Sequence, residues 1–252
     1  MPGHRFFVEL NSEAKAALGT TVALSDTDSH HARDVLRLSA GDAVIVCDKS
    51  SAVRFSGVIA DTEPQVTVRL ARLYEHAQKH SRVKQILFAL CKGDHNDLVC
   101  EKVTELGVEV VHFFQAERSV VKISPTDIEK KLQRWKKISE GAAKQCDRGA
   151  PPEVLLSTSL KEALNRSKTL YTPNDSFFFC ALTKESAELR ALAVPLARIH
   201  IAVGPEGDFT PAEEKEFVTQ GFKPVSLGPT VLRSETAAIA AIAMANAVWG
   251  YE

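Results

Sequence analysis

Alternating hydrophobic and polar positions run through the first third of the chain. The segments FFVEL, AVIVCD, RFSGVIA and QVTVRLARLY are short and rich in β-branched and aromatic residues, with turn signals at Gly41-Asp42 and Glu63-Pro64. Between the first two segments, HHARDVLRL has helical spacing. This pattern predicts a small β-barrel with one helix over residues 1–73. The polar stretch EHAQKHSR predicts a linker over residues 74–83.

A different pattern follows the linker. The apolar runs QILFAL, EVVHFF, SFFFCAL and RIHIAV are continuous, which is typical of parallel strands buried on both faces. Helical segments lie between them: one opens at Ser124-Pro125, and another has a capping box formed by Thr210 and Glu213. Because strands alternate with helices, we predict an α/β domain with a parallel sheet over residues 84–252. The last segment, ETAAIAAIAMANAVW, is apolar almost all round and predicts a helix buried on every side.

Composition narrows the class of protein. Hydrophobic residues make up 44% and charged residues 25%, as in globular proteins, and no apolar run reaches the roughly 18 residues of a membrane span. The five cysteines are widely spaced and form no Cys-x-x-Cys pair, so we expect reduced thiols and a cytoplasmic protein without a secretion signal. His30-His31 has no further ligands at sensible spacing, so we expect no metal.

The charge is segregated along the chain, although the net charge is -1. From Arg118 to Arg148 there are nine basic and four acidic residues. Lys130, Arg134 and Lys137 share one face of the helix that opens at Ser124-Pro125, opposite an apolar face. This face predicts contacts with nucleic-acid phosphates, and a solvated helix face is the alternative.

Two Gly-Pro loops carry the candidate chemistry. In IAVGPEGDFTPAEEKEF and in VSLGPTVLRSETAAIAAIA, a strand runs into a Gly-Pro turn and then into a helix. Glycine lets the backbone approach a ligand closely, and open α/β sheets bind ligands at the carboxyl ends of their strands. Ordinary strand–helix turns, with Arg233 and Glu235 as a surface ion pair, are the alternative.

These motifs resemble a known family. GPEG followed by LGP-x-x-LR-x-ETA is similar to the knotted SPOUT methyltransferases, and specifically to the 16S ribosomal RNA uridine-N3 methyltransferases. HRFF and HHARDVLRLSAGD resemble the PUA-like RNA-binding barrel of that family, and LCKGDHNDLVCEKVTELGV and AAKQCDRGAPPEV resemble parts of its catalytic domain. The resemblance covers nearly the whole chain. Asp208 and Thr230 depart from it, because the family usually has glycine and arginine there.

The resemblance implies a fold and a cofactor. The expected fold is a PUA-like β-barrel followed by an α/β parallel-sheet domain with a trefoil knot. The expected cofactor is S-adenosyl-L-methionine (SAM), and the expected assembly is a homodimer. The residues expected to hold SAM are Leu182, Val203, Gly204, Pro205, Glu206, Gly207, Leu227, Gly228, Val231, Leu232 and Thr236.

The same resemblance, together with the basic helix, implies an RNA substrate: 16S ribosomal RNA or the small ribosomal subunit. The residues expected to contact it are Arg5, His31, Arg37, Lys92, Lys130, Arg134, Lys137 and Arg148. Methylation at uridine N3 requires loss of an imino proton and alignment of the ring, without a covalent nucleophile. We expect Arg233 to stabilise the negative charge on uracil, and Glu235 to orient Arg233 or assist proton removal. The alternatives are a ribose 2′-O-methyltransferase on the same fold and a non-catalytic RNA-binding assembly factor.

Overall fold

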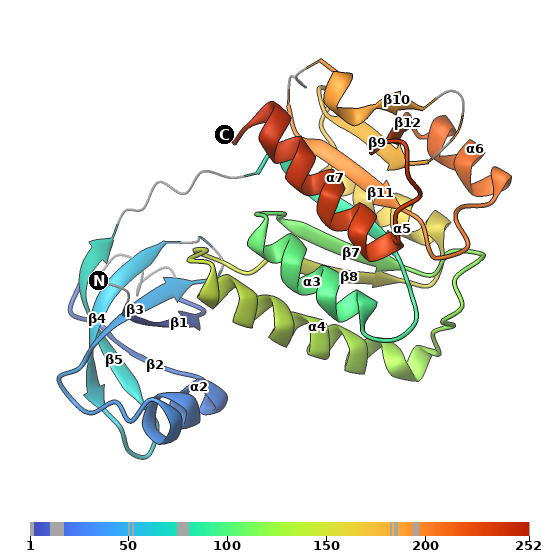
Figure 1. Cartoon of the computed structure of the whole chain (residues 1–252). Coiled ribbons are helices and arrows are strands. Elements are labelled where there is room, and N and C mark those ends of the chain that lie inside the picture. Colours follow the sequence, from blue (N-terminus) through green and yellow to red (C-terminus); the bar gives the residue numbers. More distant parts are fainter. Residues whose placement is uncertain are drawn as a thin grey trace. The chain divides into compact units, whose positions relative to one another are not determined.

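The chain forms two compact units. The computed structural model describes residues 3–10, 18–49, 51, 53–74, 81–181, 183, 186–193 and 197–251 (Figure 1). Unit 1 consists of Met1–Gln78 with Ala143–Pro151, and unit 2 consists of Lys79–Ala142 with Pro152–Glu252. Most of the predicted linker over 74–83 lies outside the described residues, which omit 75–80.

Unit 1 is a small, curled five-stranded sheet in the order β1-β3-β4-β5-β2. Its pairings are antiparallel except β1 with β3, and its core contains Phe6, Val46, Phe55 and Leu70. The helix predicted from HHARDVLRL forms only in part: α2 ends at its first residue, His30, and a π-helical turn, His31–Val35, follows. The bounds are β1 His4–Val8, β2 Thr21–Ala23, α2 Asp26–His30, β3 Ala43–Asp48, β4 Arg54–Asp61 and β5 Thr67–Tyr74.

The segment Ala143–Pro151 belongs to unit 1, although the sequence pattern assigned nothing beyond residue 73 to it. Asp147 connects this segment to the sheet, because its Oδ1 lies 2.7 Å from Arg5 Nη2 and 2.8 Å from Arg54 Nη1. Arg54 is only 4% exposed, so Asp147 compensates a buried charge.

Unit 2 contains a seven-stranded sheet in the order β10-β12-β9-β11-β6-β7-β8, and every pairing is parallel. This confirms the predicted α/β class. The strands are β6 Val83–Ala89, β7 Val110–Phe114, β8 Glu153–Ser157, β9 Ser176–Cys180, β10 Ala187–Glu188, β11 Ile199–Val203 and β12 Lys223–Ser226. The helices are α3 His95–Glu105, α4 Pro125–Gln145, α5 Leu160–Ser167, α6 Pro211–Thr219 and α7 Ser234–Trp249, with short 3-10 turns η2 Lys168–Leu170 and η3 Leu189–Ala191.

Helices cover both faces of this sheet. One apolar cluster joins the sheet to α3, α4 and α7, and a second joins its other face to α5 and α6 (Figure 1). The predicted helix starts are confirmed: α4 begins at Pro125, and the capping box of Thr210 and Glu213 begins α6. The predicted apolar face of α4 packs on the core, with Trp135 2% exposed.

The prediction that the last helix is buried on every side is wrong for the single chain. α7 buries Ala238, Ala241 and Ile242 against α3, β6 and β11, but Thr236 and Val248 are exposed and Met244 is only partly buried. An apolar sequence predicts that a helix is shielded from water, but it does not predict which neighbouring element shields each face.

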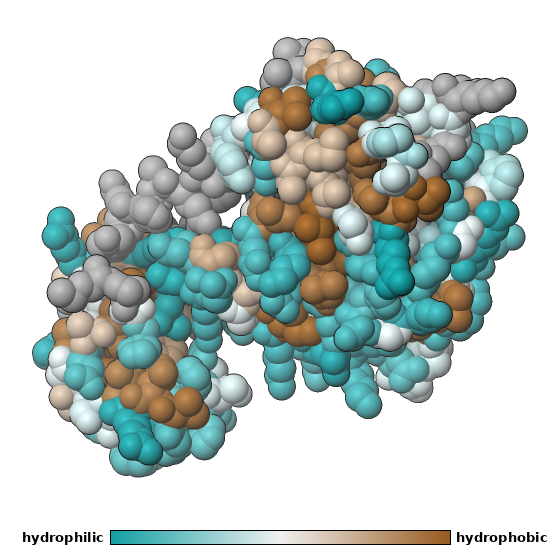
Figure 2. Space-filling model, in the orientation of Figure 1, coloured by the Kyte–Doolittle hydropathy of each residue, from teal (hydrophilic) through white to brown (hydrophobic). Residues whose placement is uncertain are grey.

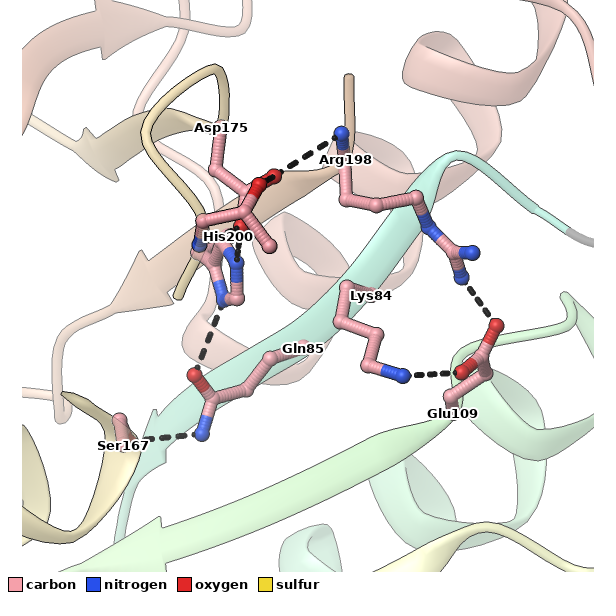
Figure 3. A network of polar contacts seen from close by, with 8 residues as sticks. Lys84, Gln85, Glu109, Ser167, Asp175, Arg198 and His200 are labelled. Atoms are coloured by element: carbon pink, nitrogen blue, oxygen red, sulfur yellow. Dashed lines mark hydrogen bonds and ion pairs between the residues drawn. The ribbon is translucent and has the colours of Figure 1, made fainter. Parts of the chain in front are cut away.

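A buried polar network lies at the amino ends of the strands (Figure 3). His200 in β11 lies 3.0 Å from Asp175 Oδ2 through Nε2 and 3.1 Å from the amide of Gln85 through Nδ1. The same amide lies 2.8 Å from Ser167 Oγ, and His112 contacts both the Gln85 amide and Ser167. Burial lowers the pKa of His112 and of His200 to about 4, so both imidazoles are neutral at pH 7.

Candidate functional site

The two Gly-Pro loops meet at the opposite edge of the sheet, where the strands have their carboxyl ends. They form a cavity of about 520 Å³ together with the residues after β6 and β9 and the start of α7. The cavity is lined by Lys92, His95, Cys180, Ala181, Val203, Gly204, Pro205, Glu206, Asp208, Val225, Leu227, Thr230, Val231, Leu232, Arg233, Ser234, Glu235 and Ala237. The spatial pairing of the two loops is what a ligand site at the edge of an α/β sheet requires.

The lining combines an apolar wall with an acidic rim. Val203, Leu227 and Leu232 contribute alkyl groups, whereas Glu206 and Glu235 contribute carboxylates. Burial works to raise the pKa of Glu206, but hydrogen bonds from backbone N–H groups, Lys92 first, outweigh burial and lower this pKa. The Lys92 N–H donates to Glu206 Oε1 over 2.9 Å, which ties the turn after β6 to the loop after β11.

Glu235 is paired within the cavity with a residue that the sequence analysis did not select. Its Oε2 lies 3.0 Å from Nδ1 of His95, the first residue of α3. The resemblance instead predicts that Glu235 orients Arg233 or assists proton removal. Arg233 is exposed, and its guanidinium has no ion-pair partner among the residues that the structure describes.

Arg118 holds the loop after β11 from outside the cavity. Its Nη1 donates to the carbonyl oxygens of Gly207 over 3.1 Å and of Phe209 over 3.2 Å. The neighbouring Glu117 N–H donates to Glu213 Oε1 over 2.9 Å. The loop after β7 therefore fixes the Gly-Pro loop, which helps to hold the cavity in shape.

Backbone conformation explains two residues of these loops. Asp208 has φ +59°, a left-handed conformation that glycine adopts freely and that Asp tolerates better than most residues. Asp208 can therefore occupy a position at which the resemblance leads us to expect glycine. At Gly204, a Cβ would lie 3.3 Å from Asp208 Oδ1 and 3.4 Å from the Phe209 N atom. A side chain at this position would crowd its own loop, so packing favours glycine there in addition to the ligand approach that the sequence suggests.

Most of the expected SAM-binding residues line the cavity: Val203, Gly204, Pro205, Glu206, Leu227, Val231 and Leu232. Gly207, Gly228 and Thr236 lie beside lining residues in the chain but are not part of the lining. Leu182 lies outside the described residues. Both expected catalytic residues, Arg233 and Glu235, line the cavity.

A second cavity of about 960 Å³ lies between the start of α3 and the basic face of α4. Its basic lining residues are Lys122, Lys130, Lys131, Arg134 and Lys137. Lys130 and Lys137 are exposed and have no ion-pair partner among the described residues, whereas Arg134 pairs with Asp97. The turn after β6 borders both cavities, because Gly93 and Asp94 line this one while Lys92 and His95 line the other. We call this second cavity the basic groove.

The expected RNA-binding residues of unit 1 divide into two groups. His31 and Arg37 are exposed. Arg5 instead binds the Lys144 carbonyl oxygen and Asp147, and Arg148 is 7% exposed. Because phosphates are contacted at the surface, the structure favours a structural role for Arg5 and Arg148 over the expected RNA contact.

The cysteines near the cavity are protonated thiols at neutral pH. Burial raises the pKa of Cys91 and of Cys180 to about 12. A thiol is a much weaker nucleophile than its thiolate, so this site does not favour covalent attack by cysteine. No group of three or more His, Cys, Asp or Glu side chains suited to a metal occurs within the described ranges. Within the same ranges, the helices are too short or too polar to span a membrane.

Comparison with known proteins identifies the family. Residues 78–246 match the model of the RNA methyltransferase domain, and residues 24–70 match that of the RNA methyltransferase PUA domain. The chain belongs to the RNA methyltransferase family. The first match covers both Gly-Pro loops and the cavity, which confirms the family that the loop motifs indicated.

Individual relatives agree over nearly the whole chain. The methyltransferase is 28% identical to the ribosomal RNA small subunit methyltransferase E of Bacillus subtilis, over 94% of each chain. A Neisseria gonorrhoeae structure of a ribosomal RNA small subunit methyltransferase E, bound to SAM, is 26% identical, covers 98% of each chain and has a TM-score of 0.83. A Legionella pneumophila structure, also with SAM bound, is 29% identical, covers 97% of each chain and has a TM-score of 0.83.

His95, Cys180, Asp208 and Thr230 are lining residues that the sequence analysis did not assign to the site. For His95 a signal was present. It follows the apolar run QILFAL within a polar turn, and the rule that selected the Gly-Pro loops, namely ligand sites at the carboxyl ends of parallel strands, applies equally to that turn.

Proposed function

We propose that this enzyme transfers the methyl group of SAM to N3 of a uridine in 16S ribosomal RNA of the small subunit. The observation that supports this most directly is the adjacency of an acid-rimmed cavity and a basic groove, which share the turn after β6. The acid-rimmed cavity can accommodate a small cationic cofactor, and the basic groove can attract an RNA backbone. The ribosomal RNA methyltransferases among the relatives support the class of substrate.

The residues of the cavity fit SAM. Its volume of about 520 Å³ lies within the range of small-molecule sites. The apolar wall of Val203, Leu227 and Leu232 suits an adenine ring, and the carboxylates of Glu206 and Glu235 suit a ligand that carries sulfonium and ammonium charges. We propose that the expected SAM-binding residues hold it, with Gly207, Gly228 and Thr236 supporting the loops rather than lining the cavity.

Arg233 has a direct task in this reaction. SAM supplies an electrophilic methyl group when it is bound. Arg233, exposed at the mouth of α7, then stabilises the negative charge that uracil gains as its imino proton leaves. The protonated thiols of Cys91 and Cys180 support direct attack by a ring nitrogen over covalent catalysis.

We propose that RNA lies along the basic groove, with Lys130 and Lys137 contacting phosphates and Lys92 bridging to the cavity. Unit 1 provides a further RNA contact through His31 and Arg37. The match of residues 24–70 to the PUA domain of RNA methyltransferases supports this division into an RNA-binding domain over 1–73 and a methyltransferase domain over 84–252. Since the proposed substrate is ribosomal, we place the enzyme in the cytoplasm.

The strand order supports the proposed trefoil knot. β9 and β11 are neighbours, yet the chain that connects them passes through β10, on the far side of β12. β12 therefore lies between two strands that precede it in the chain, β9 and β10, and α7, which follows β12, contacts η3, which precedes β11. In a knotted chain, the last strand and helix are expected to pack between segments that precede them, as β12 and α7 do.

We also propose a homodimer in which α7 lies at the interface. Its partly exposed face has no charged side chain between Thr236 and Val248, and the surface over this helix is largely apolar (Figure 2). Two-fold homodimers are the commonest oligomers, and such a face becomes buried in one. Light scattering at micromolar concentration that shows an active monomer would contradict this proposal.

The test of function is methylation in vitro. Purified enzyme is incubated with SAM and either small ribosomal subunits or free 16S RNA from cells that lack the enzyme, and the nucleosides are analysed by mass spectrometry. We expect N3-methyluridine. A 2′-O-methylated nucleoside would indicate a ribose methyltransferase, and calorimetry that detects no SAM binding would indicate a non-catalytic assembly factor.

A further inference from the structure

His95 and Glu235 form a carboxylate–imidazole pair inside the cavity. His95 begins α3, Glu235 lies in the first turn of α7, and Nδ1 and Oε2 are 3.0 Å apart. The side chains are 27% and 11% exposed, so the pair is reachable from the cavity but largely screened from solvent. Residues 95 and 235 are brought together only because α3 packs against α7.

The pair leaves one nitrogen of His95 available. If Nδ1–H donates to Glu235, the neutral ring has its acceptor lone pair at Nε2. Nε2 has no hydrogen-bond partner among the described residues, and a Cβ at Gly93 would lie 3.9 Å from it, so glycine leaves space beside this nitrogen. The carboxylate fixes the tautomer, in the way that a buried carboxylate orients the histidine of a hydrolase triad.

The charges around His95 come from every element that borders it. Lys92 and Cys91 lie in the turn after β6, Glu206 lies on the loop after β11, and Arg233 lies with Glu235 at the start of α7. Lys92 and Arg233 are basic side chains, Cys91 carries a thiol, and Glu206 and Glu235 carry carboxyl groups. His95 is one of the electrostatic influences on Glu206, so the imidazole lies within range of both carboxylates. Two carboxylates stabilise an imidazolium that forms at this position.

We propose that His95 is a catalytic residue that accepts the imino proton of the uridine, and that Glu235 is its positioning residue. This rests on the proposed function. The proton on uracil N3 moves to Nε2 of His95, and the electron pair left on N3 forms the bond to the methyl carbon. The carbon–sulfur bond breaks with its electron pair remaining on sulfur. The imidazolium afterwards releases its proton to water, and Arg233 compensates the charge on the ring meanwhile.

The experiment compares wild type, His95→Gln and His95→Ala. Single-turnover rates of N3-methyluridine formation are measured with saturating SAM and RNA from pH 6 to pH 9, and SAM affinity is measured by calorimetry. The matched control is His30→Gln in unit 1, which removes a histidine paired with a carboxylate, since His30 Nδ1 lies 2.5 Å from Asp34 Oδ2. Neither His30 nor Asp34 belongs to the cavity.

We expect His95→Gln to lower the rate by about 10²-fold or more at neutral pH, as for loss of a general base. The wild-type rate should rise with pH and level off, whereas the variant rate should rise with hydroxide over the whole range. Added imidazole should restore part of the rate of His95→Ala but not raise that of wild type. SAM affinity should change little, and His30→Gln should behave like wild type.

A His95→Gln rate within threefold of wild type would overturn the assignment. A loss of equal size at every pH would also overturn it, because misplacement of the substrate lowers the rate without changing the pH profile. The proposed function itself fails if wild type forms no N3-methyluridine, in which case both fall. The assignment of His95 fails alone when wild type forms this product and the variants keep its profile.

Discussion

Lowering the pH from 7 to 5 should destabilise unit 2 through two buried histidines. His112 and His200 are 0% exposed, and burial lowers the pKa of each from 6.5 to about 4. In the unfolded chain each histidine takes up a proton near pH 6.5, but in the folded chain it stays neutral until about pH 4. The unfolded state therefore binds more protons between these values, and stability is lost as the pH falls.

The magnitude follows from the size of the shift. A shift of about 2.5 pKa units corresponds to about 3.4 kcal/mol when it is expressed in full. Between pH 7 and pH 5 only part of this free energy is lost: the free energy of unfolding falls by about 2 kcal/mol for each histidine and so by about 4 kcal/mol for both. The lowered pKa values of Glu109 and Asp175 act in the same direction, but they matter only below the ordinary values of 4.5 and 3.8. The window from pH 7 to pH 5 therefore isolates the histidines.

The assay is urea unfolding followed by tryptophan fluorescence. Both tryptophans, Trp135 and Trp249, lie in unit 2, so this signal reports that unit. We expect His112→Asn to remove about half of the pH dependence, and His31→Gln, at an exposed position, to leave it unchanged. A wild-type change of less than about 1 kcal/mol between pH 7 and pH 5 would refute the reasoning, because it would mean that the buried imidazoles cost nothing to protonate.

Three further predictions concern the site. Arg233→Ala should lower the single-turnover rate by about 10²–10³-fold, as for one lost preorganised donor, with SAM affinity by calorimetry nearly unchanged; a near-normal rate would make the residue structural. Lys130→Gln with Lys137→Gln should reduce the salt dependence of RNA binding by up to about two phosphate contacts, and an identical slope would return α4 to a solvated face. Asp208→Ala should destabilise unit 2 by about 1–2 kcal/mol in urea unfolding while Asp208→Gly should not, because φ is +59° there; equal stabilities would contradict this.

The parts of the site that depend on local sequence could be predicted. A Gly-Pro pair directly after an apolar run identifies a loop at the end of a strand, and both such loops line the cavity. β8 and β10 were not predicted: β8 has three apolar residues of five and β10 has only two residues, whereas the equally short β7, β9 and β11 each have four apolar residues of five. The fold class could also be predicted from local sequence, because apolar runs alternate with segments that carry helix-capping residues.

The contacts that depend on distant pairing could not be predicted. His95 meets Glu235, and the Lys92 N–H donates to a glutamate 114 positions further along the chain. No pattern in the sequence around these residues indicates either contact. The sequence placed Glu235 beside Arg233 because the two are near neighbours in the chain, whereas α3 packing on α7 decides the partner.

The order in which the sheet of unit 2 is assembled has a consequence for translation. β12 pairs with β9 and β10, and α7 packs on β6 and β11, yet both are synthesised after all those strands. A nascent chain that has emerged only as far as β11 has neither of the two Gly-Pro loops and neither Arg233 nor Glu235. The ribosome that makes this enzyme therefore carries an inactive chain, and methyl transfer can begin only after residues 223–249 have left the exit tunnel.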